Sequence, residues 1–502
     1  MSAGNKLFRD PVHGYIEVPD VYCSRYVDTE VFQRLRFVEQ SSMRMLYPAA
    51  RHDRFIHSLG VYSIAKKVYS SIAKRFEAVD DNMTVRESFR ETFLVAALLH
   101  DCAHSPFSHT GEHIAKKYCG EEIERKLIEV VGSDAFRKDF YDTDLETDYA
   151  THELASAYVG CKRFGSEFGT FVDKEQFARM ITGIKNKCID SPVNRAYNCL
   201  ISLLNGFIVD VDRLDYLQRD TWATGICNAS VDVDRLINGI DVDVFKGRVS
   251  VNHIALASFV NAISARDYIF SWVIPDHIVS YANEILERGI ENLISAMASE
   301  GMAPTDVGRA MFSPDRLLPG GEEWIRGEVI HLPTDGDILY LMKKYIPNDV
   351  YFNAYSRRDK THISLWKTYA EFLNIFRATL ERRHQRSFSD ANFWELFRGK
   401  LHNFTGNNPH CICTSPTVIK NTRRHLKLVD VDIEDSYSSG VLNRSHLDLT
   451  YMFGDEVEED RYYFNAYILA SSGGANDETG PMRTIEKLQA LLKDTMDEFD
   501  GR

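Results

Sequence analysis

The stretch FLVAALLHD, residues 93–101, restricts the fold of this 502-residue chain more than any other. Seven consecutive apolar residues close a segment with helical periodicity, which predicts a helix over residues 84–101 that is buried on most of its faces. Thr84 and Glu87 have the spacing of a capping box at its start. The His100-Asp101 pair that follows needs partners from elsewhere in the chain to become a metal site.

Similar periodicity predicts further helices over residues 53–76, with Asp53 as the cap, and over 198–220, 277–299, 336–346, 362–383 and 484–499. From residue 405 the β-branched and aromatic residues in PTVIKNTRRHLKLVDVDIED and DRYYFNAYILASS are typical of strands. The glycine-rich stretch 471–481 is expected to be a loop or linker.

These sequence patterns predict a mainly α protein with a mixed α/β C-terminal region. We expect a catalytic core over residues 1–312, which ends at the Pro/Gly-rich stretch SPDRLLPGGEEW. A helical extension over 313–404 follows, and then a mixed α/β region over 405–502 that is a candidate oligomer interface.

The composition excludes several classes of function. The net charge of −14 disfavours extended binding to a nucleic-acid backbone, although a small basic pocket for one nucleotide remains compatible with it. The sequence contains no run of about 18 apolar residues and no leader-like start, so we expect neither a membrane span nor a signal peptide. Nine scattered cysteines favour a reducing cytoplasm, and Cys411 with Cys413 is interpreted as two ordinary thiols.

Four histidines lie within LLHDCAHSPFSHTGEH, residues 98–113. Ser105-Pro106 predicts the start of a new helix, so His100 and His104 would lie on either side of a break. The pattern is therefore a poor match to the H-E-x-x-H helix of zinc proteases.

Two other segments offer partners for His100-Asp101. His57 is predicted near the start of one helix, and Asp212, Asp215 and Arg219 share a face of another at spacings i, i+3 and i+7. Carboxylates within a hydrophobic helix are costly unless they are paired or bind a cation. Taken singly, a histidine such as His57 is more often a hydrogen-bonded residue at a helix start, and an aspartate such as Asp212 is more often a salt-bridge partner of Arg213, Arg219 or another base.

The order of a histidine, a His-Asp pair and an aspartate resembles the HD-domain metal-dependent phosphohydrolases. The context narrows the resemblance to the deoxynucleoside triphosphate triphosphohydrolases, which include bacterial dGTPases and the animal sterile-alpha-motif/HD-domain enzyme. The motifs that carry it, in the family's order, are DPVHGYIEV (10–18), FQRLRFVEQ (32–40), YPAARHDRFIHSLGV (47–61), HDCAHSPFSH (100–109) and DVDRLDYLQRD (210–220). The resemblance covers residues 8–310, and TDGDILYLMKK (334–344) also looks family-like.

The resemblance implies an HD-domain helical core and a divalent metal, Fe, Mn, Zn or Co with Mg as a further option. The implied ligands are His57, His100, Asp101 and Asp212. Two imidazoles and two carboxylates suit such ions better than calcium. The implied reaction is attack of water at the α-phosphorus of a dNTP, with dGTP as a leading candidate, to give deoxynucleoside and triphosphate.

The same resemblance implies roles for other residues. The catalytic residues would be His104, which protonates the leaving 5′-oxygen or contacts the α-phosphate, and its supporting pair His152 and Glu112. The substrate contacts would be Arg54, His109, Arg213 and Tyr216 for phosphate, Gln40 and Asp220 for the sugar, and His277 and Tyr281 for the pocket. The chain departs from the family at Glu112 (commonly Asp), at Arg213 (lysine in the animal enzyme) and at Ser41-Ser42-Met43-Arg44, where a leucine and a glycine-rich turn are usual.

Regulation is also implied. Asp28, Gln33 and Arg36 match guanine-nucleotide effector contacts of the animal enzyme, and enzymes of this family form homo-oligomers. An ordinary helix with Gln33 and Arg36 at i, i+3 explains the same residues without an effector. The family tunes dNTP pools, and some members restrict viruses or phages.

Two other functions stay open. Another HD phosphohydrolase could act on nucleoside monophosphates or a cyclic dinucleotide. A bimetallic phosphodiesterase would need additional histidine ligands, which His104 and His152 could supply, although their motif context argues otherwise. A nucleotide sensor with a repurposed pocket is disfavoured because all four metal positions are present.

Overall fold

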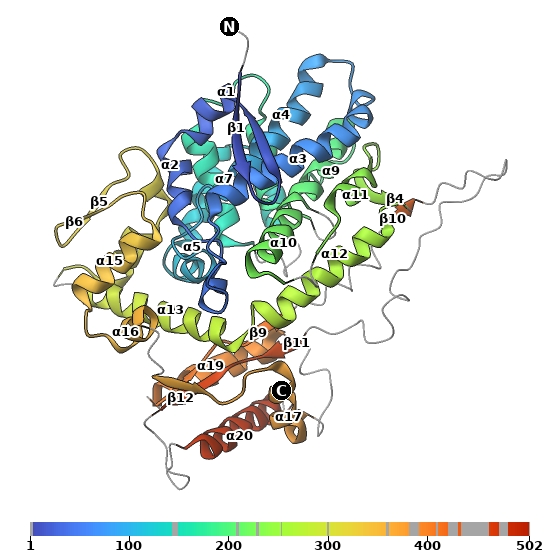
Figure 1. The fold of residues 1–502 in the computed structure, drawn as a ribbon. Coiled ribbons are helices and arrows are strands. Elements are labelled where there is room, and N and C mark those ends of the chain that lie inside the picture. The colour runs from blue at the N-terminus through green and yellow to red at the C-terminus, as the bar shows by residue number, and fades with distance from the viewer. Residues whose placement is uncertain are drawn as a thin grey trace. The chain divides into compact units, whose positions relative to one another are not determined.

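The computed structural model describes residues 4–142, 149–206, 210–226, 230–252, 254–298, 301–357, 361–380, 391–407, 410–419, 430–432, 461–470 and 480–500. The chain forms two compact units, drawn in Figure 1. Unit 1 comprises residues 1–266, 290–345 and 425–449, and unit 2 comprises residues 267–289, 346–424 and 450–502.

Unit 1 is mainly helical. Its longer helices are α3 (Arg54–Glu77), α4 (Met83–Leu99), α5 (His109–Val131), α6 (Asp134–Tyr141), α7 (Thr151–Phe164), α8 (Lys174–Thr182), α9 (Pro192–Leu204), α10 (Val211–Thr224), α12 (Leu256–Tyr268), α14 (Pro304–Phe312) and α15 (Asp335–Tyr345). Its short helical turns are α1 (Asp20–Tyr22), η1 (Cys23–Val27), α2 (Glu30–Gln33), η2 (Arg34–Phe37), η3 (Ser42–Met45), α11 (Val233–Asn238) and η6 (Pro314–Leu317).

The strands of unit 1 are short. β1 (Asn5–Asp10) and β2 (Gly14–Pro19) form an antiparallel hairpin in the register Asn5↔Pro19. β3 (Ile240–Asp243) pairs antiparallel with β4 (Arg248–Asn252), which pairs parallel with β10 (Asp430–Asp432). β5 (Glu323–Ile325) and β6 (Glu328–Ile330) form another hairpin.

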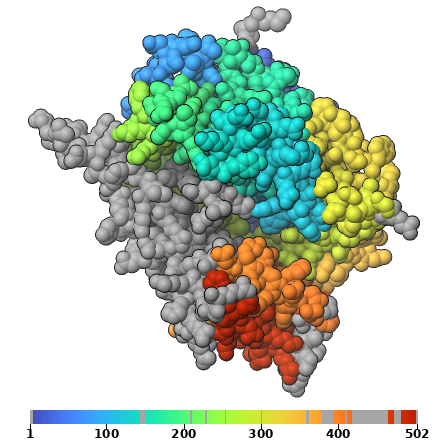
Figure 2. Space-filling view, turned by 180° about the vertical axis from the view of Figure 1, so that it is seen from behind, coloured from blue at the N-terminus to red at the C-terminus, as the bar shows by residue number. Residues whose placement is uncertain are grey.

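Helix α4 lies in the core of unit 1. Its residues from Leu94 to Leu99 are at most 2% exposed, as its apolar run predicts. α3 packs against α4 and α10, while α5 packs against α7. Figure 2 shows the opposite face, where the yellow segment that contains α14 lies beside the cyan helix α5. The packing of α3 against both α4 and α10 brings together the three segments that carry the predicted metal ligands.

Unit 2 contains η5 (Ile269–Val273), the first part of α13 (His277–Met297), α16 (Val350–Arg357), α17 (Tyr369–Leu380), α19 (Ala391–Asn407) and α20 (Pro481–Asp500). One of its sheets has the order β7-β12-β8, made of His362–Ser364, Ala466–Leu469 and Cys411–Cys413, and β9 (Thr417–Ile419) pairs with β11 (Arg461–Tyr463). Aromatic side chains make up much of its core. The indole Nε1 of the buried Trp366 donates to the carbonyl of Phe464 at 2.8 Å.

Several predicted elements are confirmed. α3, α4, α13, α15 and α20 lie where helices were expected, and the side chain of Asp53 caps α3 by accepting from Ile56 N at 2.9 Å. The mainly α class with a mixed C-terminal region is also confirmed. Most of the loop expected at 471–481 lies outside the described residues. None of the described helices is long and apolar enough to cross a membrane.

Four local predictions are wrong. The helix expected over 198–220 is two helices, because Asp210 caps α10 by accepting from Arg213 N at 2.6 Å. Asp210 therefore lies at a helix start and not inside a hydrophobic helix. The helix expected over 362–383 is strand β7 followed by α17. Asn82, not a Thr84–Glu87 box, caps α4.

The fourth error concerns Ser105-Pro106, which does not begin a helix. α5 begins at His109 after Ser108, whose φ of 51° interrupts the helical path. The expected segment boundaries at residues 312 and 404 stay a prediction. The two compact units interleave along the chain.

Candidate metal centre and active site

Three helices supply the four predicted metal ligands. His57 lies in the first turns of α3, His100 is the C-cap of α4 with Asp101 directly after it, and Asp212 lies in the first turn of α10. The described structure thus brings together residues that are up to 155 positions apart in the sequence.

The four side chains surround one point. Asp212 Oδ1 lies 2.9 Å from His57 Nε2 and 3.7 Å from His100 Nε2. Asp101 Oδ2 lies 3.6 Å from His57 Nε2 and 3.5 Å from His100 Nε2. His57, His100 and Asp101 also satisfy the spacing that a metal ion requires, with ligand atoms within 4.8 Å of one another.

The imidazoles offer the right atoms for a cation. Nδ1 of His100 lies 2.9 Å from the carbonyl of Ala97, and Nδ1 of His57 lies 2.7 Å from Asp215 Oδ2, so each Nδ1 carries the proton. Both Nε2 atoms are buried and, among the described residues, neither has a hydrogen-bond partner of ordinary geometry. Two lone pairs and two carboxylates that face one point fit a divalent metal, which the His/Asp group is able to hold.

The electrostatics also favour a positive charge at this point. Burial alone lowers the pKa of His57, but the neighbouring carboxylates of Asp212 and Asp215 raise it to about 9. Burial raises the pKa of Asp101, yet Arg54 and His100 outweigh it and hold that pKa well below its usual range. A bound metal ion would occupy the place of the proton that this environment otherwise stabilises on His57.

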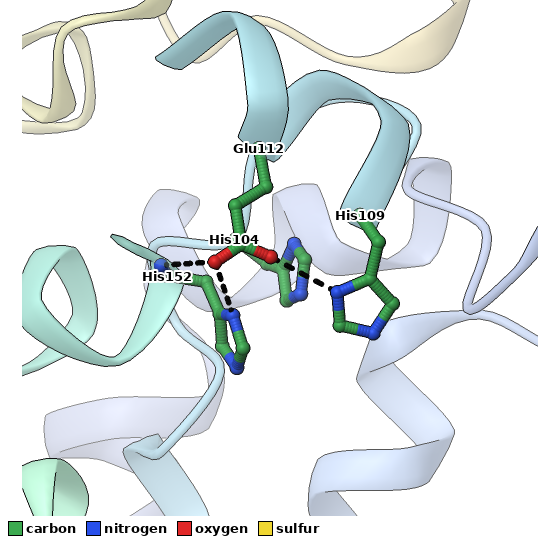
Figure 3. Close-up of side chains that lie close together, drawn as sticks. All are labelled: His104, His109, Glu112 and His152. Carbon is green, nitrogen blue, oxygen red and sulfur yellow. Dashed lines mark hydrogen bonds and ion pairs between the residues drawn. The ribbon is translucent and has the colours of Figure 1, made fainter. Parts of the chain in front are cut away.

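A second cluster, shown in Figure 3, consists of His104, of His109 and Glu112 in the first turn of α5, and of His152 in α7. Glu112 Oε1 lies 2.9 Å from His152 Nδ1, and its Oε2 lies 2.9 Å from His109 Nδ1. The ring of His104 stacks on that of His152 with a centroid distance of 4.4 Å and an interplanar angle of 17°. Both ring nitrogens of the fully buried His104 lack a hydrogen-bond partner among the described residues.

The two stacked histidines differ in charge. Burial opposes protonation of His152, but Glu112 raises its pKa to about 9, so His152 is cationic at neutral pH. Burial, Arg54 and His152 together lower the pKa of His104 well below its usual value. His104 is therefore a neutral imidazole with two available nitrogens, one of which donates and one of which accepts.

The loop that carries His104 is held from a distant part of the chain. Phe107 and Ser108 both have positive φ, 60° and 51°, which costs about 1–3 kcal/mol for each such residue. The side chain of Asp335, at the start of α15, accepts from Phe107 N at 2.6 Å and from Glu39 N at 3.0 Å. Arg34 donates to the carbonyls of His104 at 2.5 Å and Pro333 at 2.7 Å. Tertiary contacts thus stabilise a backbone conformation that the loop does not favour by itself.

Some predicted substrate contacts already have protein partners. Arg54 donates to Asp101 Oδ2 at 2.6 Å, to Ser108 Oγ at 3.0 Å and to the carbonyl of Gln40 at 3.1 Å. Arg54 therefore supports a predicted metal ligand, besides the phosphate contact predicted for it. The buried Oε1 of Gln40 has no partner among the described residues.

Other predicted contacts lie farther along α10. The Nη2 atom of Arg213 lies 3.3 Å from Asp210 Oδ2, and Asp220 Oδ1 lies 2.7 Å from His52 Nε2. Burial raises the pKa of the Tyr216 hydroxyl to about 12, so it stays protonated at neutral pH. The substrate roles of all three residues stay predictions.

His277 and Tyr281 belong to the part of α13 that lies in unit 2. The hydroxyl of Tyr281 is 2.8 Å from His362 Nδ1, and the carbonyl of His277 accepts from the hydroxyl of Tyr467 at 2.7 Å. Their role as substrate-pocket residues stays a prediction.

The three predicted effector residues lie close together in unit 1. Asp28 forms an ion pair with Lys6 at 2.5 Å, and Gln33 Oε1 accepts from Arg36 Nε at 2.9 Å. The guanidinium of Arg36 also lies over the ring of Phe55, 3.5 Å from its centroid. These contacts fit either a structural role or an effector site.

The sequence analysis missed the support behind His57. The sequence indicated only that Asp215 and Arg219 share a helix face. His13 and Asp10 appeared only as members of the motif DPVHGYIEV. The structure places all four side chains in one buried network, described below. The signal that could have found it was the recurrence of charged residues in otherwise apolar segments.

We predict that replacing both His100 and Asp101 by alanine abolishes metal binding and turnover, because it removes two of four ligands. The protein should stay folded, since Arg54 keeps Ser108 and Gln40 as partners. Metal content by mass spectrometry and thermal unfolding check both parts. The exposed His402, replaced by alanine, is the control. A double variant that retains metal and full turnover would contradict the ligand set.

Comparisons with known proteins agree with this geometry. Residues 54–217 match the HD domain family. The chain is 28% identical over 297 residues to YwfO of Bacillus subtilis, a protein described as uncharacterized, covering 59% of this chain and 57% of that one. It is 30% identical over 228 residues to the deoxynucleoside triphosphate triphosphohydrolase SAMHD1 homolog of Dictyostelium discoideum, covering 44% and 37% of the two chains.

The chain thus spans between about a third and three fifths of the length of these relatives. A crystal structure of a hypothetical protein from Aquifex aeolicus shares the fold, with a TM-score of 0.55, 19% identity, and coverage of 97% of this chain and 100% of that chain. The HD match contains His57, His100, Asp101 and Asp212 together with His104, Glu112 and His152. Residues 54–217 are therefore similar to the HD domain family, and part of the chain is similar to a deoxynucleoside triphosphate triphosphohydrolase SAMHD1 homolog.

Proposed function

We propose that this chain is a metal-dependent triphosphohydrolase that converts dNTPs, with dGTP as a leading candidate, to deoxynucleoside and triphosphate. One observation carries the proposal. The short segment 100–112 supplies two predicted metal ligands, His100 and Asp101, and also His104 and Glu112 of the second cluster. A metal ion and a group that exchanges a proton both promote the hydrolysis of a phosphate ester. In this segment the two would lie close together.

A divalent metal bound by His57, His100, Asp101 and Asp212 would lower the pKa of water and polarise a phosphoryl oxygen. Basic residues around the metal would contact the negatively charged phosphate groups. Arg54 lies beside Asp101 and has the planar fork that suits a phosphate, and Arg213 is a second base on α10.

His104 is the residue that we assign to the leaving 5′-oxygen. Burial, together with Arg54 and the cationic His152, lowers the pKa of His104 and keeps it neutral without substrate. The negative charge of a bound triphosphate opposes this repulsion and favours protonation of His104. His152, held by Glu112, positions the ring of His104 through the stacking contact.

We expect triphosphate as the primary product, formed in one step, because the acid and the metal cluster act on the bond between the α-phosphorus and the 5′-oxygen. Mass spectrometry of products from metal, protein and dNTP tests this. His104→Ala should lower kcat by about 100-fold or more with a smaller effect on KM, since the acid acts mainly in the transition state. Orthophosphate or pyrophosphate as the primary product would refute the proposal, and His402→Ala is the matched control.

A second prediction concerns the sugar. In the family a tyrosine packs close to it, and Tyr216 matches that position, so steric exclusion should favour 2′-deoxynucleotides. We expect dGTP to be hydrolysed faster than GTP, and Tyr216→Ala to narrow the difference. Initial rates with both nucleotides measure this. Equal rates in the unaltered protein would contradict it.

A second candidate function rests on the cluster of His104, His109, Glu112 and His152, whose ligand atoms lie within 4.8 Å of one another. Such a group could hold another metal and would suit a phosphodiesterase for cyclic dinucleotides, or a nucleoside monophosphatase. The product assay with these substrates separates the candidates. A protein that binds nucleotides and hydrolyses none of them would instead be a sensor.

We further propose a homo-oligomer that depends on a nucleotide bound near Asp28, Gln33 and Arg36, with a role in dNTP-pool control or antiviral or antiphage defence. Such an effector must bind the active assembly more tightly than the inactive one.

We expect mixtures of dNTPs to be hydrolysed faster than single dNTPs, and Arg36→Ala to reduce this activation. Initial rates and mass photometry measure rate and assembly together. Lys116→Ala, on the exposed surface of α5, is the control. If single and mixed dNTPs react at equal rates and Arg36→Ala changes neither rate nor assembly, the effector site does not exist.

A further inference from the structure

One buried carboxylate lies behind the predicted metal ligand His57. Asp215 Oδ2 is 2.7 Å from His57 Nδ1, and both side chains are fully buried. Asp215 lies one turn after Asp212 on α10, so a single helix contacts the imidazole at both nitrogens. Asp212 faces Nε2, on the metal side, while Asp215 accepts a hydrogen bond from Nδ1–H.

Asp215 is itself held from two directions. Arg219 donates from Nε to its Oδ2 and from Nη2 to its Oδ1, both at 2.8 Å. His13, in the turn between β1 and β2, places Nε2 2.5 Å from the same Oδ1. The network is closed by Asp10, whose Oδ2 accepts from Arg219 Nη1 at 2.8 Å and whose Oδ1 accepts from the backbone N–H of His13 at 2.6 Å.

Gly60 shows how closely this network is packed. A Cβ atom at that position would lie 1.9 Å from Asp215 Oδ1 and 2.5 Å from Arg219 Nη2. The α3 backbone thus approaches the carboxylate directly, and the absence of a side chain at Gly60 is what leaves room for the pair. Residues of the motifs DPVHG, HSLG and DVDRLDYLQRD therefore meet around one carboxylate.

We propose that Asp215, braced by Arg219 and by His13 of the N-terminal hairpin, is the positioning residue of the metal centre. It accepts a hydrogen bond from Nδ1–H of His57. This bond leaves the Nε2 lone pair for the metal and fixes the plane of the ring. The N-terminal hairpin is then part of the metal centre, although none of its residues faces the metal point. This inference rests on the metal site proposed above.

The alternative is that the network only stabilises the fold. The chain offers a matched comparison, because Asp139 is also buried and lies 2.8 Å from Nη2 of the fully buried Arg179. Asp139→Asn weakens an ion pair of the same type and burial without touching the metal cluster. Asp215→Asn does the same while it also weakens the support of His57.

The experiment measures the affinity of the full-length protein for Co²⁺ by competition with a chelator, without substrate. We expect Asp215→Asn to weaken binding by about 10- to 100-fold and to change the visible absorption spectrum of bound Co²⁺. Asp139→Asn should leave both unchanged, even if thermal unfolding shows that it destabilises the metal-free protein. Unchanged affinity in Asp215→Asn, or equal losses in both variants, would overturn the inference.

His13→Gln provides a second measurement in case Asp215→Asn does not fold, because it leaves the pairs of Arg219 with Asp215 and Asp10 in place. We expect a several-fold loss of Co²⁺ affinity, and an unchanged affinity would overturn the bracing role of the hairpin. Failure of the unaltered protein to bind Co²⁺ would instead reject the metal site itself. The two failures are therefore distinguishable.

Discussion

The burial of negative charge at one point is the constraint on which the rest of unit 1 depends. Asp101 and Asp215 are at most 1% exposed, and Asp212 is 40% exposed at its side chain, yet all three lie around His57. Uncompensated carboxylates in such a place are too costly for a stable fold. Arg54 compensates Asp101, and Arg219 compensates Asp215. Asp212 faces the two Nε2 atoms, where a bound cation would complete the balance.

This requirement explains how distant segments are joined. The start of α3, the end of α4 and the start of α10 meet because each contributes one part of a charge balance that none of them achieves alone. The N-terminal hairpin contacts this network through His13, and the start of α15 holds the loop before α5 through Asp335. The structure around the candidate site therefore consists of helix ends, where side chains and backbone groups are available for polar contacts.

The two histidine clusters divide the chemistry between them. At His57 the surrounding carboxylates stabilise a positive charge, whereas at His104 the neighbouring Arg54 and His152 oppose one. Adjacent groups with opposite charge preferences are typical of sites where one group binds a cation and another exchanges a proton with the substrate. The loop from His104 to the start of α5 carries the strain of two positive-φ residues, Phe107 and Ser108, which the contacts of Asp335 and Arg34 offset.

The sequence by itself determined the buried helix α4 and the helix α3 with its Asp53 cap, because both depend on local periodicity and capping. The predicted metal ligands came from the resemblance to the HD-domain enzymes, and not from periodicity. The start of α5 at His109 and the network behind His57 were decided only by the tertiary structure. Both depend on a partner far along the chain: Asp335 for the loop before α5, and His13 and Asp10 for Asp215 and Arg219. Local propensity carries no information about such partners, because the free energy of a buried hydrogen bond or ion pair exists only once both members have been brought together.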